Sequence, residues 1–515
     1  MQGQLFSTDF LLRGITETEP WRALTETALD AFIAQLQTLY AVHHVDSALN
    51  ESQTEDELIE PVLAQLGWSD SWLSQVNLSQ TGREDVPDFL LFADPATKTR
   101  ALAEKDDRRA LHGIALLEAK RWMRLLDRSE GKVGSNRKSR DFGAPSSQML
   151  RYLSRADVMS DRAIKWGILT NGALWRLYWQ DARSRAEDFF EVNVAAALGV
   201  TGVPQELEGP QNRHALKLFF LFFHRAAFLS QSWDTQRRSF HAIAQAQARW
   251  YEEKVSQNLG QRVFDEVFPA LANALIASDV QAVKDPKGRY NREYLEELRE
   301  AALVLLYRLL FVFYAEDRRL LPVTDSRYAS YSLSELRDKA AQALDSGKAL
   351  SGTAATYWSV LDDLFLIISQ GDDQVGMPAY NGGLFERTRA PILARVRVPD
   401  VRMARVIDAL SRRIEDSTKP RINYRDLSVA HLGSIYERLL EYTLVQETTE
   451  DGKTTLLARP ASFARKVSGS YYTHDHLVRL ILDEAVGLRV SECIVGYEKL
   501  LAAYRKKTQL KPYEW

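Results

Sequence analysis

Cysteine is nearly absent from this chain of 515 residues, which contains only Cys493. A single thiol excludes an intramolecular disulfide framework and any cysteine-rich zinc site, which fits a reducing compartment. The opening residues lack the basic flank and apolar run of a secretory signal. The longest apolar runs, 216–223 and 301–315, are short or interrupted by Arg308, so neither predicts a membrane span. We therefore expect a cytoplasmic protein with no membrane partner.

A strong net charge is missing as well. The chain has 66 basic and 69 acidic side chains and a formal charge of -3, so its overall charge does not attract nucleic acid. Any nucleic acid would have to bind a local basic surface. The segment 121–140 is such a surface, since seven lysines and arginines face only Asp127 and Glu130 there. It is either a solvated loop or a set of phosphate contacts.

The spacing of apolar residues predicts an α/β part followed by a long helical block, and the length predicts two or three domains. Residues 86–92 and 113–120 are strand-like runs joined by a polar surface loop over 94–112. A helix is expected from about Gln53, with Thr54 as its cap, and another over 147–154. Residues 166–179 predict a hairpin that turns at Asn171-Gly172. Further helices are expected at 212–232, 236–256, 260–278, 291–316, 333–346, 354–370, 401–414 and 427–445, with a polar hairpin-like stretch at 447–455.

The strongest chemical signal is an aspartate and a Glu-x-Lys pair at the ends of the two strand-like runs. Asp88 follows Val86-Pro87, and Glu118-Ala119-Lys120 ends the second run. Two carboxylates on paired strands can hold Mg²⁺, while a lysine two residues after the glutamate lies on the same strand face. Mg²⁺ can polarise a phosphodiester and activate water, which the lysine can orient. The alternative is a pair of edge strands that end in solvated charges.

Two neighbouring helices carry companions to this motif. Glu51 and Glu55 lie near one face of the helix that precedes the strands, and either is a weaker metal-ligand candidate, with Glu51 preferred. Most helix glutamates are solvated, which is the competing interpretation. Gln148 and Tyr152 lie one turn apart on the later helix.

Pro87-Asp88, Glu118-Ala119-Lys120 and Gln148-x-x-x-Tyr152 together resemble the PD-(D/E)xK nuclease domain of type I restriction subunits and type IIG restriction-modification enzymes. The resemblance implies that Asp88, Glu118 and Glu51 bind Mg²⁺ and that Lys120 assists the attacking water. It also implies that Gln148 and Tyr152 support the catalytic site, and that the partner is double-stranded DNA. Self-association on DNA remains open.

A second cluster lies near the carboxyl-terminal end. Arg465 to Thr473 resembles the opening motif of the N6-adenine methyltransferase domain in type IIG enzymes, although His474 stands where that family usually has proline. The resemblance implies an S-adenosylmethionine pocket. A packed aromatic turn is the alternative. The residues expected to line the pocket are Gly469, Tyr471, Tyr472 and Thr473.

The later motifs of that methyltransferase family are missing. Neither an Asp-Pro-x-x-Gly-Ser-Gly loop nor an Asn-Pro-Pro-Tyr motif follows Thr473, so we expect the chain to be the amino-terminal part of a larger enzyme. A Gly-x-x-x-x-Gly-Lys-Ser/Thr phosphate loop is also missing, which argues against an ATP-driven translocase in this piece.

We thus expect an α/β PD-(D/E)xK nuclease domain at 1–205, an all-helical connector at 206–460 and the start of a Rossmann-like methyltransferase domain at 461–515. The expected function is Mg²⁺-dependent DNA cleavage coupled to adenine methylation. One alternative is a site-specific adenine methyltransferase, for example in phage defence, whose nuclease-like domain only binds DNA. Another is a non-enzymatic helical scaffold that docks a partner.

Overall fold

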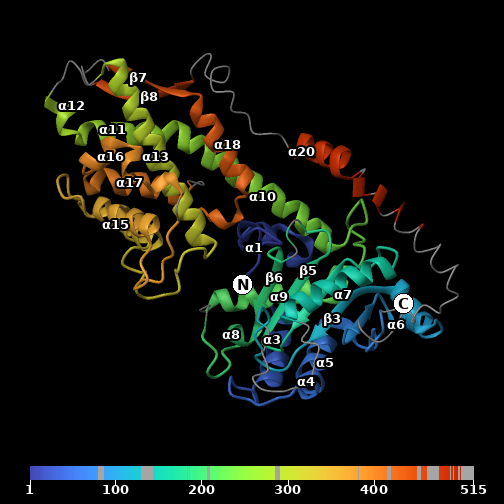
Figure 1. Ribbon diagram of the computed structural model, residues 1–515. Helices are drawn as coiled ribbons and strands as arrows, with labels where there is room; N and C mark the ends of the chain where they lie inside the picture. Colours follow the sequence, from blue (N-terminus) through green and yellow to red (C-terminus); the bar gives the residue numbers. More distant parts are fainter. Residues whose placement is uncertain are drawn as a thin grey trace, which may run out of the picture. The chain divides into compact units, whose positions relative to one another are not determined.

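The computed structural model divides into two compact units, one built on Met1–Tyr251 and the other on Glu252–Glu492 (Figure 1). It describes residues 1–78, 86–128, 143–182, 184, 186–205, 209–284, 290–380, 382–413, 419–448, 454–460 and 475–487, with seven more between 489 and 499. In the described part, no helix combines the length and apolarity needed to cross a membrane.

A six-stranded sheet forms the centre of the first unit, and its strands lie side by side in chain order. Neighbouring strands are antiparallel except β3 and β4, which are parallel and are joined through the helix α7. A parallel pair needs such a crossover connection, whereas a tight turn suffices for an antiparallel pair. The strands are β1 (Trp72–Ser74), β2 (Phe89–Phe92), β3 (Gly113–Ala119), β4 (Trp166–Thr170), β5 (Leu174–Trp179) and β6 (Phe189–Asn193).

Helices cover both faces of this sheet. They are α1 (Thr8–Leu12), α2 (Glu19–Ala23), α3 (Glu26–Tyr40), α4 (Glu51–Thr54), α5 (Glu60–Leu63), α6 (Pro95–Leu102), α7 (Pro145–Met159), α8 (Val194–Leu198), α9 (Pro210–Phe223) and the start of α10 (Phe240–Arg262). Single helical turns extend or link them at η1 (Gly14–Glu17), η2 (Glu55–Ile59), η3 (Ala64–Trp68), η4 (Asp106–His112) and η5 (Arg225–Phe228).

Alternation along the strands explains the two apolar layers. Leu116 of β3 packs in one core with Met149 and Leu153 of α7. Leu117, the next residue, belongs to the opposite core with side chains of α3 and α9. Because successive strand residues point to opposite faces, Glu118 falls on the same face as Leu116, the one that α7 covers. Burial on both faces explains why β2 and β3 are almost continuously apolar.

The second unit is mostly helical and has its own core. The rest of α10 leads into η6 (Val263–Val267), and the longest helix, α13, has Leu306 and Leu309 fully buried. The other helices are α11 (Phe268–Ser278), α12 (Val280–Lys284), α13 (Arg292–Asp317), α14 (Leu333–Asp345), α15 (Thr356–Gln370), α16 (Pro391–Arg395), α17 (Asp400–Ser411), α18 (Val429–Leu440) and α20 (Asp475–Leu482). The short turns are η7 (Gly383–Phe385), η8 (Arg387–Arg389), η9 (Tyr424–Asp426) and η10 (Asp483–Gly487), and β7 (Tyr442–Thr448) pairs with β8 (Thr454–Pro460) in an antiparallel hairpin.

The coarse expectation of an α/β part followed by a helical block is confirmed, but several details differ. The expected loop at 94–112 contains α6 and η4, and Asp94 caps α6 by accepting a hydrogen bond from the Thr97 amide. The last expected helix stops at Leu440, because 442–448 pairs with β8 instead. The first unit also runs past residue 205, since α9 packs its aromatic side chains into the core beside the sheet.

Candidate active site

The helix that enters the site is capped by Asn50. The Asn50 side chain accepts a hydrogen bond from the Gln53 amide at 2.9 Å, and the Gln53 side chain accepts one from the Asn50 amide at 3.1 Å. This reciprocal pairing starts the helix at Glu51. Thr54 was expected to be the cap, and that expectation is wrong, because its side chain is fully buried one turn later. The four-residue spacing then places Glu51 and Glu55 on one face.

Asp88 lies immediately before β2 and is held against the end of β3. Its Oδ2 accepts a hydrogen bond from the Ala119 amide at 2.7 Å, and its own carbonyl accepts one from the Gln75 amide at 2.8 Å. The Asp88 carboxylate therefore lies across from the Glu118-Ala119-Lys120 segment, as the sequence pattern predicted.

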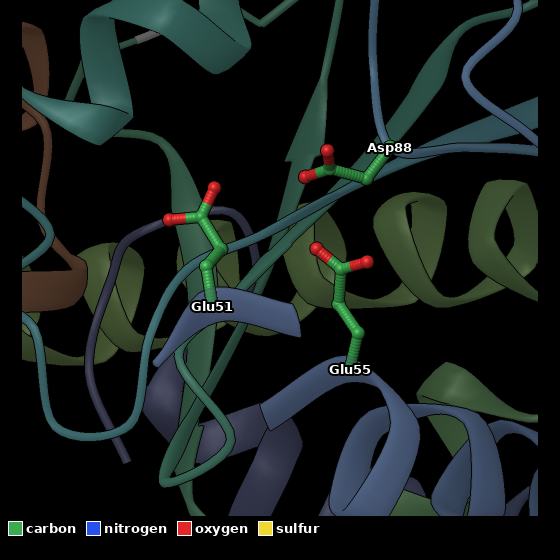
Figure 2. A group of neighbouring side chains, drawn as sticks. All are labelled: Glu51, Glu55 and Asp88. Carbon is green, nitrogen blue, oxygen red and sulfur yellow. The ribbon is translucent and has the colours of Figure 1, made fainter. Parts of the chain in front are cut away.

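Three carboxylates converge beside this strand end. Glu51, Glu55 and Asp88 each have an oxygen within 4.8 Å of the others. Figure 2 shows Glu51 and Glu55 reaching from neighbouring turns of the entry helix toward Asp88, with the three carboxylates directed into a shared space. All three residues are partly buried. A cluster of anionic oxygens at this separation is costly unless a cation lies near it.

Lys120 is the nearest cation among the described residues. Its side chain is 4% exposed, and its Nζ donates to Glu118 Oε1 at 2.5 Å and to the Ala119 carbonyl at 2.7 Å. A longer ion pair of 3.5 Å joins the same Nζ to Glu51 Oε1. Lys120 thus connects the strand end to the entry helix, and its ammonium is immobilised beside the three carboxylates.

The electrostatics show an excess of negative charge. Burial, reinforced by the charges of Asp88 and Glu51, raises the pKa of Glu55 to about 7. Burial also raises the pKa of Asp88 and that of Glu118, although Lys120 opposes both shifts. Burial disfavours the charged form of Lys120, but Glu118, Asp88 and Glu51 outweigh this effect and raise its pKa. One ammonium therefore does not neutralise four carboxylates.

Gln148 and Tyr152 lie together on α7. The Gln148 amide nitrogen donates to the Tyr152 hydroxyl at 2.9 Å, and Tyr152 is buried among the side chains of the α7 face. The charge of Glu118 contributes to a raised pKa for Tyr152, after the larger effect of burial. Tyr152 is thus close enough to Glu118 for its charge to affect the hydroxyl, and the supporting role of the pair stays a prediction.

The residues after Lys120 are anchored at several points. The Trp122 amide donates to Thr54 Oγ1 at 2.9 Å, and the Asn171 side chain donates to the Arg124 carbonyl at 2.7 Å. Arg176, nearly buried on β5, makes two hydrogen bonds to Asp127, at 2.7 and 2.9 Å. These contacts fix residues 121–128. Most of the expected basic segment, 129–140, lies outside the described residues.

Sequence reasoning missed the role of Arg176. Its Nε also donates to Glu191 Oε2 at 2.8 Å, and the two residues face each other across β5 and β6. Strand register places Glu118 opposite Leu169, and Leu169 opposite Arg176, so the charged residues share one row of the sheet. A charged residue inside an otherwise apolar strand was the available signal, because such residues are rarely buried without a partner.

The donor set fits a hard divalent cation. Glu51, Glu55 and Asp88 offer only carboxylate oxygens, which suit Mg²⁺, Ca²⁺ or Mn²⁺ better than softer metals. Glu118 has one buried oxygen, Oε2, without a hydrogen-bond partner among the described residues. These residues together could hold Mg²⁺, and the cation would favour the charged forms of Glu55, Asp88 and Glu118, whose pKa values are raised first by burial and then by neighbouring carboxylates.

The structure brings most of the expected site residues together. Asp88, Glu118, Lys120 and Glu51 meet at one strand end, with Gln148 and Tyr152 on the neighbouring helix. Glu55, which we ranked below Glu51, lies as close to the other two carboxylates as the 4.8 Å grouping requires, so it is an equal candidate ligand. The carboxylate of Glu118 pairs with Lys120 instead of joining the three, so its role as a metal ligand stays a prediction. Gly469, Tyr471, Tyr472 and Thr473 lie outside the described residues.

Comparisons with known proteins identify no relative: no protein-family model, no curated protein and no solved structure matches the chain.

Proposed function

We propose that the first unit is a Mg²⁺-dependent DNA endonuclease and that the protein is a restriction-modification enzyme of the type IIG kind. The observation that carries the proposal is the convergence of Glu51, Glu55 and Asp88 beside the immobilised ammonium of Lys120. This grouping combines a site for a hard cation with a positive charge, as phosphodiester hydrolysis requires.

Each side chain would have a defined task. Glu51, Glu55 and Asp88 would hold the cation, with Glu118 as a further ligand. When bound, Mg²⁺ supplies Lewis-acid polarisation of the phosphate and a water of lowered pKa. Lys120 would orient that water or offset the charge that develops on the phosphate. Gln148 and Tyr152 would keep the α7 side of the site in position.

The DNA partner is supported by the residues that follow Lys120. Arg121, Arg124 and Arg128 are described and lie in the anchored segment, so positive charge borders the strand end. Contacts of this kind bind phosphates and weaken as salt increases. The methyltransferase half of the proposal rests on the sequence motif around Tyr471 and Tyr472 and on S-adenosylmethionine as cofactor.

The endonuclease is tested by incubating the full chain and unmodified phage DNA with Mg²⁺, with and without EDTA. We expect Mg²⁺-dependent cleavage that falls by on the order of 100-fold or more in Lys120→Ala, because a positioned catalytic group contributes about that much. Asp88→Asn should reduce cleavage at least as much, because it removes a proposed metal ligand. Glu57→Gln, an exposed residue on the same helical segment as Glu55, is the matched control and should cut normally.

Cleavage that persists in both Lys120→Ala and Asp88→Asn would refute the assigned site. DNA binding without cleavage under any divalent cation would favour the alternative in which this domain only binds DNA. The cofactor assignment is tested separately by cross-linking labelled S-adenosylmethionine to the full chain, which should be lost in Tyr471→Ala.

A further inference from the structure

The second unit contains a cavity that the proposed nuclease function does not use. It has a volume of about 60 Å³ and lies among α13, α15, η8 and α16. One water molecule needs only ~10–15 Å³ measured in this way, so the space accommodates a small polyatomic ligand. Its polar lining consists of Arg308, Asp362, Arg387, Arg397 and Trp358.

Arg308 is a buried cation that pairs with no carboxylate among the described residues. It is 5% exposed, and it donates to the carbonyls of Leu384 at 2.8 Å and Glu386 at 2.9 Å. No ion pair joins it to an acidic group in the part of the chain that the structure describes. Burial lowers its pKa to about 10, with partial opposition from Asp362. A buried charge of this kind is costly unless an opposite charge approaches it.

The other charged groups leave the cavity positive. Asp362 Oδ2 lies 3.5 Å from Arg387 Nη2 and 3.9 Å from Arg397 Nη2, so its one negative charge is shared between two exposed arginines. Three guanidinium groups against one carboxylate leave an excess of two positive charges. Trp358, 4% exposed, adds an indole N–H that has no acceptor among the described residues.

We propose that this cavity binds the phosphate group of a small phosphomonoester or of inorganic phosphate. A phosphate dianion matches the excess charge, and its oxygens accept hydrogen bonds from planar guanidinium groups in a bidentate manner. It would also provide an acceptor for the unsatisfied donor on Trp358. The apolar side chains of the lining, among them Leu305, Leu361 and Phe365, would strengthen these contacts by excluding water.

Isothermal titration calorimetry of the full chain with inorganic phosphate, at constant ionic strength set with sodium chloride, tests this site. Saturable binding of one phosphate per chain is expected. Arg387→Ala should weaken it by about tenfold, since it removes one charge-assisted contact. Asp362→Asn should tighten binding, because it removes the only negative charge of the lining. Trp358→Phe should weaken phosphate binding, because it keeps an aromatic side chain but removes the indole N–H.

Arg389→Ala is the matched control, because Arg389 lies on the same turn as Arg387 but pairs with Glu300 and does not line the cavity. Both arginines are exposed, so neither variant should disturb folding. A second titration with glycerol 3-phosphate distinguishes the ligand sources: tighter binding than inorganic phosphate identifies a monoester. The proposal fails if neither ligand gives saturable heat, or if Arg387→Ala and Arg389→Ala bind equally.

Discussion

Glu55 is one of the carboxylates whose ionisation affects metal binding at the proposed site. Its pKa is raised to about 7, so about half of the Glu55 side chains are protonated near pH 7 when no cation is present. A metal ligand must be deprotonated, so binding of Mg²⁺ should release this proton and strengthen as pH rises through 7. The pH dependence of metal affinity therefore reports on Glu55 together with Glu118, whose pKa burial raises to about 8.

We predict that Mg²⁺ raises the thermal stability of the first unit and that Glu55→Gln reduces the effect. A ligand at about 100 times its dissociation constant adds roughly 2.7 kcal/mol to the free energy of unfolding. Differential scanning fluorimetry with and without Mg²⁺ measures it, and EDTA should reverse it. Glu57→Gln removes the same charge from an exposed position and should respond like the unmodified chain. An equal response in all three proteins would exclude Glu55 as a ligand.

His241 is a second residue whose ionisation is coupled to the fold. It is fully buried, its Nε2–H donates to the Phe222 carbonyl at 2.8 Å, and its Nδ1 has no partner among the described residues. Burial lowers its pKa to about 4, although the bond to Phe222 opposes the shift. Protonation would place a charged N–H in an apolar site beside Trp166 and Phe228.

The lowered pKa of His241 makes the free energy of unfolding depend on pH. An unfolded histidine binds a proton near pH 6.5 and the folded one only near pH 4, so the stabilisation by neutral His241 is complete above about 6.5. It should be lost as pH falls from 6.5 to 4, by up to roughly 3 kcal/mol. We predict that in His241→Gln the free energy of unfolding, measured by urea denaturation at a series of pH values, changes less between pH 6.5 and 4. A profile as steep as that of the unmodified chain would contradict the prediction.

At the scale of elements, the turn between β4 and β5 packs against Leu58 of the entry helix and against Trp122, which follows the site. Gly172 has a φ of +81°, and the Asn171 side chain accepts hydrogen bonds from the amides of Ala173 and Leu174. A Cβ at residue 172 would lie 2.8 Å from Leu58 and 3.0 Å from Trp122. The turn therefore requires glycine both for its backbone conformation and for the close approach of η2.

We predict that Gly172→Ala lowers the free energy of unfolding by roughly 2–4 kcal/mol, because backbone strain adds to overpacking. Gly199→Ala is the comparison. Residue 199 also has a positive φ, +72°, but the nearest atom to its Cβ would be Gln205 Nε2 at 3.8 Å. That variant should lose only about 1 kcal/mol. Equal losses in urea denaturation would show that crowding against η2 contributes nothing.

At the scale of the whole molecule, the two units have separate hydrophobic cores. The core of the second unit contains residues from Val255 to Leu456, whereas both cores around the sheet end at Ala248 or earlier. We predict two calorimetric transitions. Leu306→Ala should lower the temperature of one transition and Leu117→Ala that of the other. Each substitution should reduce the free energy of unfolding of its unit by about 2–5 kcal/mol, since both side chains are fully buried. If either substitution shifts both transitions equally, the units unfold together.

Local sequence pattern was sufficient for much of this architecture. The strands at 86–92 and 113–120, the hairpin turning at Asn171-Gly172 and the helix that carries Gln148 and Tyr152 are all confirmed. The helix α6 was missed because its sequence is short and polar, and its N-terminal cap at Asp94 resembles a turn. The first residues of β7, 442–445, were assigned to a helix because their pairing partner β8 lies beyond a polar stretch.

The order of residues indicates which side chains could form a metal site, because Asp88 and the Glu118-x-Lys120 pair stand at the ends of apolar runs. Which carboxylates meet depends on contacts between distant segments. Glu51 and Glu55 reach Asp88 because Thr54 binds the Trp122 amide and because the Asp88 side chain binds the Ala119 amide. Both contacts join segments far apart in the chain, and a pattern of neighbouring residues contains no information about such distances.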